Sequence, residues 1–173
     1  MYLISLYFDD TANRILQRHI DRAAQKSGNT FMTDNSVPPH MTVSALEARS
    51  AAELIPAFER LEGDLKGGEV DFVTVGQLFP YVIYAAPVLN AYLQELSEKV
   101  HSCFKDLEGV SMSRYYLPGS WLPHVTIGKT LDKQQMRLAF EALQESFAPF
   151  TGRVTAMGLA SVNPHTDVSV IEL

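Results

Sequence analysis

The chain has 173 residues, of which 14 are basic and 20 are acidic, giving a formal net charge of −6 at pH 7. This length suits one domain with a substantial core, and a composition of 46% apolar and 20% charged residues excludes disordered and collagen-like proteins. Proteins that coat long DNA or RNA are normally basic, so that class is disfavoured. The single cysteine, Cys103, excludes a disulfide framework and a cysteine-rich zinc site.

The apolar run at the N-terminus does not resemble a signal peptide. No basic segment precedes Tyr2–Phe8, and Asp9 and Asp10 close it. The run is also far shorter than the ~20 residues needed to span a bilayer, and no other apolar run is long enough. We therefore expect a soluble, cytoplasmic protein without a membrane partner.

The first quarter of the chain predicts a strand, a helix and a second strand. Tyr2–Phe8 is almost continuously apolar, which is typical of a buried strand. Apolar residues at helical spacing follow, with Asp10 or Thr11 as the expected cap and Gly28 as the end of the helix. Two prolines then lead into an apolar strand over 41–46.

A second helix and a hairpin are predicted next. Ser50 with Glu53 forms a capping-box pattern before apolar residues at helical spacing. Pro56 lies deep in that pattern and makes the start of the helix uncertain. The segments 70–75 and 81–86 flank a Phe-Pro turn and predict a β-hairpin.

The second half repeats the alternation of helix and strand. An amphipathic helix is predicted over 87–105, with Pro87 in its first turn, and a strand over 125–128. Asp132 with Gln135 opens another helix, and two more strands follow around Asn163-Pro164. The pattern indicates an α+β fold. Because no linker separates the similar halves, we expect residues 1–173 to form one domain with two lobes.

Two segments 84 residues apart share the pattern Pro-His-apolar-Thr-apolar-small, namely PHMTVS at 39–44 and PHVTIG at 123–128. Alternate residues of a strand face the same side. His40 therefore projects beside Thr42, and His124 projects beside Thr126. One His-x-Thr would be a weak signal, since threonine is common in strands. Two copies, each led by proline, are difficult to explain by packing alone.

Two such imidazole–hydroxyl pairs can converge on one cleft if the lobes are related by pseudo-symmetry. Imidazoles titrate near neutral pH, so one can accept a proton while the other donates one. Two hydroxyls can bind an anion between them. A phosphodiester matches this set, because its displacement needs a base, an acid and donors to the non-bridging oxygens. No metal or cofactor is required.

At these residues the sequence resembles the 2H phosphoesterase superfamily, which includes 2′-5′ RNA ligase-like proteins and 2′,3′-cyclic phosphodiesterases. The family is named for its two His-x-Thr/Ser motifs. Arg is common in the ligase-like branch where this chain has Lys129, which we include as a candidate phosphate contact. The resemblance implies a bilobal α+β fold with two pseudo-symmetric mixed or antiparallel sheets, flanking helices and a central cleft. It also implies metal-independent action on 2′,3′-cyclic or 2′-5′ phosphodiesters of nucleotides or RNA ends.

The resemblance also implies roles for the motif residues. His124 would activate the nucleophile and His40 would protonate the leaving oxygen, although on chemical grounds either histidine can be the base. Thr42 and Thr126 would bind the phosphate oxygens.

The loop that precedes the second motif is a further candidate for substrate binding. Its aromatic side chains can stack on a base and its arginine can pair with a phosphate, or the same side chains can cover the core. The tentative substrate-binding residues are Arg114, Tyr115, Tyr116 and Trp121.

Other histidines and the cysteine are given structural interpretations. The threonine after His165 is adjacent to it, so this is not a third motif, and we interpret His165 as a turn residue. His19 and His101 are expected on the surface, and Cys103 in the core. A basic stripe of arginines on the first helix is interpreted as a solvated face.

Three other functions remain open. A binding module of the same fold would hold a nucleotide or RNA end without turnover. A metal-dependent hydrolase would use His40, His124 and His165 as zinc ligands. A scaffold protein would carry the motifs incidentally. The sequence does not indicate an oligomeric state.

Overall fold

The computed structural model describes residues 1–162 and 164–173, and it confirms the α+β class. In chain order the elements are β1 (Tyr2–Phe8), α1 (Asp10–Ser27), α2 (Phe31–Asp34), β2 (Met41–Glu47), the 3-10 helix η1 (Ala51–Glu53), α3 (Ile55–Glu59), β3 (Glu69–Leu78), β4 (Val82–Pro87), α4 (Ala91–Phe104), β5 (Ser111–Met112), the 3-10 helix η2 (Arg114–Tyr116), β6 (Val125–Gly128), α5 (Lys133–Ser146), β7 (Phe150–Ser161) and β8 (Thr166–Glu172).

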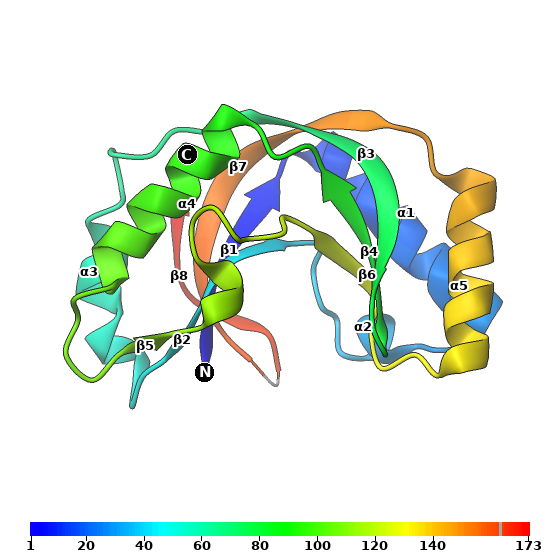
Figure 1. Cartoon of the computed structure of the whole chain (residues 1–173), viewed down its shortest axis with the longest axis horizontal. Helices are drawn as coiled ribbons and strands as arrows, with labels where there is room; N and C mark the ends of the chain where they lie inside the picture. The colour runs from blue at the N-terminus through cyan, green and yellow to red at the C-terminus, as the bar shows by residue number, and fades with distance from the viewer. Residues whose placement is uncertain (163) are drawn as a thin grey trace.

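The strands form one connected eight-stranded antiparallel sheet, in the order β1-β2-β6-β4-β3-β7-β8 with β5 on β2. β1 also pairs with β7, so the pairings close into a ring. We expected two sheets. They are joined because β2 pairs with β6 at Met41 and Val125, and β3 pairs with β7 over 69–72. Figure 1 shows the strands arching between two groups of helices.

The two groups of helices define two lobes. In one lobe α1 packs beside α5, against β6 and β4. In the other, α4 packs beside α3 and against β2. α1 precedes β2 in the chain and α4 precedes β6, so each motif strand follows a helix that packs in the opposite lobe. The two motif strands, β2 and β6, nevertheless lie side by side in the sheet.

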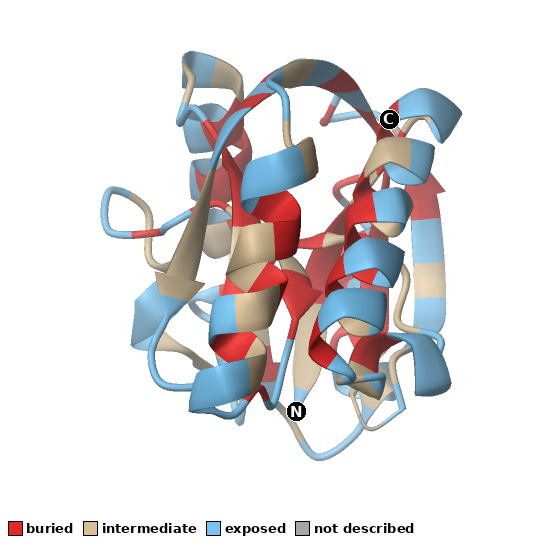
Figure 2. Ribbon diagram, turned by 90° about the vertical axis from the view of Figure 1, so that its right-hand side faces the viewer, coloured by how far each residue is buried: buried red, intermediate tan, exposed pale blue. Residues whose placement is uncertain are grey.

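Each helix buries one face against the sheet and exposes the other, as Figure 2 shows for the side that carries α1 and α5. Leu16 and Ile20 of α1 are buried, and so are Ala139 and Leu143 of α5. The long apolar run of β1 is buried because β1 lies between β2 and β7. α1 therefore packs behind β6, and α5 packs behind the neighbouring β4.

The first helix begins one residue earlier than expected. Asp9 is its cap, and one carboxylate oxygen accepts bonds from the backbone N–H groups of Thr11 and Ala12 at 2.9 and 3.0 Å. The other oxygen accepts a 2.6 Å bond from the N–H of Arg153 on β7. Burial alone would raise the pKa of Asp9, but these donors together outweigh it and lower that pKa. Gly28 ends the helix as predicted, with a left-handed φ of 73°.

The expected capping box at Ser50 is not formed. The Ser50 side chain makes no capping bond, and a Glu53 carboxylate oxygen instead accepts a 3.2 Å bond from the N–H of Arg49. The helix that follows, α3, is short because Pro56 must lie in a first turn. By contrast, the predicted capping box of Asp132 and Gln135 on α5 is confirmed.

The prediction that Pro87 lies in a helix is wrong. Pro87 is the last residue of β4 and pairs with Phe72 of β3. α4 begins later, at Ala91, where the Asn90 side chain accepts a 2.9 Å bond from the N–H of Leu93. The hairpin of β3 and β4 is confirmed.

The final two strands, β7 and β8, are also confirmed. Asn163, in the turn expected between them, lies outside the described residues. Over residues 1–162 and 164–173, no helix is both long and apolar enough to cross a membrane.

Candidate active site

The two motifs lie next to each other because β2 pairs with β6. Met41 is opposite Val125, so the histidines that precede these residues start adjacent strands. Both apolar residues are fully buried and fix the strands to the core. On the other face, both histidines and both threonines line one cleft of about 1000 Å³. The predicted convergence of the two motifs therefore exists in the structure.

Each motif histidine makes the same local hydrogen bond. The Nδ1 of His40 lies 2.8 Å from the carbonyl oxygen of Pro38, and the Nδ1 of His124 lies 2.9 Å from that of Leu122. A carbonyl oxygen can only accept, so Nδ1 must carry the proton in both rings. In the neutral imidazole, Nε2 is then left with a free lone pair. Each neutral histidine can therefore accept a proton at Nε2.

The two imidazoles differ in how strongly the protein disfavours their protonation. The pKa of His40 is lowered to about 4, mainly by burial, with smaller contributions from the charges of His165, His124 and Lys129. The carbonyl of Pro38 opposes this change. Burial also lowers the pKa of His124, opposed by the carbonyl of Leu122. Both histidines are therefore neutral in the resting protein at pH 7.

An aromatic ring lies against each histidine. Tyr84 of β4 is 5.2 Å from His124 between ring centroids, with the planes tilted by 57°. His165 is 4.5 Å from His40, with the planes tilted by 32°. His165 also lines the cleft. Its interpretation as a simple turn residue therefore missed a neighbour of the first motif.

Trp121 is not placed to stack on a substrate. It is 6% exposed and is not among the described residues that line the cleft. Its Nε1–H donates a 3.0 Å hydrogen bond to the carbonyl oxygen of Thr42. The indole therefore holds the backbone of a motif residue from behind, which corrects its assignment as a tentative substrate contact.

The other loop candidates do line the cleft. Arg114, Tyr115 and Tyr116 lie along one side of it, and Lys129 lies beyond the second motif. The guanidinium of Arg114 is 5.1 Å from the ring centroid of Tyr115, which is 69% exposed. The ammonium of Lys129 is 5.8 Å from the ring of Phe31. Two cationic side chains, each lying over an aromatic ring, therefore line the same cleft as the two histidines.

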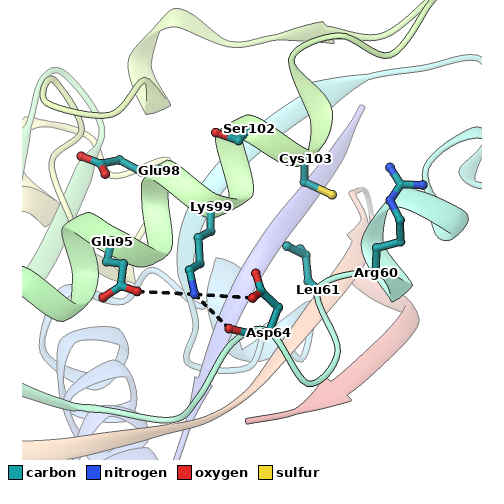
Figure 3. A pocket seen from close by; sticks show the side chains of 8 residues that line it. All are labelled: Arg60, Leu61, Asp64, Glu95, Glu98, Lys99, Ser102 and Cys103. Carbon is teal, nitrogen blue, oxygen red and sulfur yellow. Dashed lines mark hydrogen bonds and ion pairs between the residues drawn. The ribbon is translucent and has the colours of Figure 1, made fainter.

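A second hollow, between α3 and α4, differs from this cleft in its chemistry (Figure 3). Its one lysine, Lys99, is paired with the carboxylates of Glu95 at 3.4 Å and Asp64 at 3.8 Å. Cys103 lines it and is half-buried, not in the core as expected, and its thiol donates a 2.9 Å bond to the carbonyl of Ala57. Lys99 is therefore already paired within this hollow.

One further sequence interpretation changes, and one of the alternative functions lacks support. His19 is buried, 5.5 Å from the ring of Phe147, and is not a surface residue. The three-histidine zinc set is not formed, since the described part of the chain contains no group of three or more His, Cys, Asp or Glu side chains placed to hold a metal ion.

Comparison with known families decides the assignment. The model of the 2′-5′ RNA ligase superfamily matches residues 12–165. The chain belongs to the 2′-5′ RNA ligase superfamily. Its members are 2H phosphoesterases, enzymes that act on phosphodiester bonds, and this protein is an enzyme of that class. The match includes both motifs and ends at His165.

Solved structures show the superfamily fold in other proteins. A crystal structure of a phosphoesterase aligns with a TM-score of 0.67 at 15% identity, covering 99% of this chain and 97% of that one. E. coli LigT complexed with 3′-AMP gives 0.66 at 14% identity, with the same coverage. TT0787 of Thermus thermophilus gives 0.64 at 16%, again covering 99% and 97%. Comparison with curated protein sequences gives no match.

Proposed function

We propose that this 2H phosphoesterase cleaves 2′,3′-cyclic or 2′-5′ phosphodiesters of nucleotides or RNA ends, with His40 and His124 as its acid–base pair. The observation that carries this proposal is the duplicated Nδ1–carbonyl bond, which leaves two Nε2 atoms available in one cleft. The threonine beside each histidine supplies a hydroxyl donor. These four side chains provide the groups that phosphodiester displacement needs, without a metal ion.

In hydrolysis, the phosphodiester anion binds between the motifs and accepts hydrogen bonds from Thr42 and Thr126. One histidine takes a proton from a water molecule as the water oxygen forms its bond to phosphorus. The bond from phosphorus to a ribose oxygen breaks, and the other histidine, which took up a proton from solvent when the anion bound, protonates that oxygen. The proton removed and the proton delivered balance, and a second exchange with solvent restores both rings.

The different surroundings of the two histidines favour His40 as the base. Burial is the main cause that lowers the pKa of His40 to about 4, with smaller contributions from Lys129 and from His165 and His124 when these are protonated, so His40 stays neutral and able to accept a proton. The causes that lower the pKa of His124 do not include such charges. A bound phosphodiester anion stabilises a proton on His124, which makes it the acid. This reverses the roles that the family resemblance implies.

A small or terminal substrate fits the cleft best. A volume of about 1000 Å³ is at the upper end of ligand pockets and accommodates a nucleotide. The acidic net charge of −6 disfavours long RNA. LigT, which shares the fold, has been crystallised with 3′-AMP and with phosphate. Arg114 and Tyr115 lie where they can contact a phosphate and a base.

The first experiment is turnover of a 2′,3′-cyclic mononucleotide in EDTA by the wild type and by His40→Ala and His124→Ala. Each variant should lose about 10²- to 10⁴-fold in kcat, the usual contribution of a general acid or base. His101→Ala is the matched control, because His101 is on α4 and outside the cleft. Turnover retained by both site variants would contradict the proposal. Nucleotide binding without wild-type turnover would favour a binding module.

A second substrate shows which histidine is the base and which is the acid. An ester with a nitrophenolate leaving group needs no proton donor, because nitrophenolate leaves readily as an anion. His124→Ala should therefore recover most of its loss on that ester, while His40→Ala should not. The opposite pattern would restore the assignment implied by the resemblance.

A further inference from the structure

A chain of hydrogen bonds runs behind the ring that faces His40. The Nε2 of His165 lies 3.0 Å from the hydroxyl oxygen of Tyr7. That hydroxyl donates a 2.5 Å bond to a carboxylate oxygen of Asp167. Tyr7 is on β1 and Asp167 is on β8, two strands that both pair with β7. Residues from opposite ends of the chain are therefore linked at one edge of the cleft.

A glycine on the strand between them makes this link possible. Gly158 of β7 pairs with Ser5 on one side and Val170 on the other. A Cβ atom at this position would lie 2.6 Å from the Asp167 carboxylate and 2.7 Å from the Tyr7 ring. Both distances are too short for any side chain. The absence of a side chain at Gly158 thus lets Tyr7 and Asp167 approach each other across β7.

The direction of each bond fixes the state of His165. Because the Tyr7 hydroxyl donates its proton to Asp167, its oxygen must accept from His165, and Nε2 carries a proton. Burial first, and then the bond to Asp167, raise the pKa of Tyr7, so its hydroxyl remains protonated. The ring of His165 is therefore held in one tautomer and one orientation, with its face against His40.

We propose that Tyr7, His165 and Asp167 form a relay that positions His40 and biases it toward its neutral form. The proposal rests on the proposed function of His40 as the base. His165 fixes the His40 ring by contact. When His165 is protonated, its positive charge disfavours protonation of His40. Neither Tyr7 nor Asp167 needs to contact the substrate, so these are positioning residues. The ring beside the second motif histidine, His124, is that of Tyr84, which cannot carry a positive charge as His165 can.

The relay has a consequence for pH dependence. The charged groups that lower the pKa of His40 are His165, His124 and Lys129, in addition to burial. The pKa of His165 is lowered, because burial outweighs the opposing charge of Asp167, so His165 carries a charge only in acid. His165→Phe keeps the ring and the burial but removes the charge. The pKa of His40 must then rise, and the acidic limb of kcat/KM must move to higher pH.

The test uses Tyr7→Phe and His165→Phe on a 2′,3′-cyclic mononucleotide. Both should lower kcat by about 10- to 100-fold, the size expected when a reacting group is poorly positioned, and leave KM within about twofold. His165→Gln, which keeps an amide donor toward Tyr7, should recover part of kcat. Tyr81→Phe is the matched control because Tyr81 is exposed and outside the cleft. Unchanged kcat in both variants, or a rise in KM alone, would overturn the relay.

A titration of the His40 imidazole by NMR separates this proposal from the proposed function. The pKa of His40 should be higher in His165→Phe than in the wild type, and unchanged in Tyr81→Phe. This reading needs no turnover, so it tests the relay even if the wild type does not cleave the substrate. An unchanged His40 pKa in His165→Phe would overturn the relay, whether or not the enzyme turns over.

Discussion

The two motif threonines differ in their surroundings, although the sequence presents them as equivalent. Thr42 is 8% exposed, and the indole of Trp121 holds its carbonyl oxygen, whereas Thr126 is more accessible. Both hydroxyls border the cleft beside a histidine. A donor in a buried site is worth more than one in contact with water, because water competes less for the anion.

Removing either hydroxyl without changing the shape of the side chain should slow the reaction. Thr42→Val and Thr126→Val should each lower kcat by about 10²-fold, as expected for the loss of one donor to a developing negative charge. The loss should be larger for Thr42→Val. Steady-state kinetics measure this, with Thr74→Val on the exposed face of β3 as the control. Equal rates for wild type and both variants would remove the threonines from the mechanism.

Buried neutral histidines also make the fold sensitive to acid. The pKa of His40 is lowered from its ordinary value of 6.5 to about 4. The unfolded chain therefore binds a proton between these two values that the native protein does not. The free energy of unfolding should fall as pH drops from about 6.5 to about 4, by up to about 3 kcal/mol from this residue.

Urea unfolding at several pH values measures this effect. The slope between pH 4 and pH 6.5 should be smaller in His40→Gln, which cannot be protonated. A slope of the same size in the variant would mean that His40 titrates normally.

At the residue scale, the sequence contained enough information to find the motif residues but not their supports. Period-two alternation by itself places His40 beside Thr42. His165 has its threonine as the next residue, so the same rule gives no reason to select it. Tyr7 lies in an apolar run and resembles a core residue. Its bond to Asp167 depends on the order β1-β7-β8, which no local pattern encodes.

Among the elements, the loop before β6 illustrates how packing decides between two equal alternatives. Its aromatic residues could either cover the core or contact a substrate. The structure divides them, because Trp121 points inward to Thr42 while Arg114 and Tyr115 remain at the cleft. The loop therefore connects one side of the cleft to the backbone of β2.

Breaking that connection should affect both stability and binding. Trp121→Phe keeps an aromatic ring but removes the donor to the carbonyl of Thr42. An unpaired buried group of this kind costs about 1–3 kcal/mol. We expect a matching loss in the free energy of unfolding and a several-fold rise in KM, measured by circular dichroism and kinetics. A variant with wild-type stability and KM would show that the hydrogen bond from Trp121 to Thr42 contributes neither to stability nor to substrate binding.

The element boundaries show where sequence patterns succeed. Asp132 and Gln135 form the capping box on α5, although the Gln135 side-chain oxygen also accepts a 3.3 Å bond from the Asn29 side chain. Glu53 fits the same pattern but instead accepts the N–H of Arg49. Proline favours the first turn of a helix, yet Pro87 shows that it also tolerates the end of a strand such as β4. Local hydrogen bonds decided the two capping patterns, and strand pairing with β3 decided the place of Pro87.

For the whole molecule, the cleft lies where the two lobes meet, and a ligand there contacts strands of both. Any ligand that binds only the native protein stabilises it by mass action, by about 2.7 kcal/mol at 100 times its Kd. Inorganic phosphate and 3′-AMP should therefore raise the Tm in a concentration-dependent manner. The shift should be lost in the double variant Thr42→Val/Thr126→Val. An equal shift in that variant would place the anion elsewhere.

α1 packs in the lobe of the second motif strand, and α4 packs in the lobe of the first. The fold therefore resembles a domain-swapped dimer whose two subunits are joined in one chain. Each half of the sequence donates a helix that completes the other half, as partners do when they exchange an element. A polypeptide cut before β3 would leave the apolar side of α1 without β6 and α5. Two copies of that fragment could cover these exposed faces by exchanging α1. Such a pair would carry two identical His40 motifs, related by a true twofold axis.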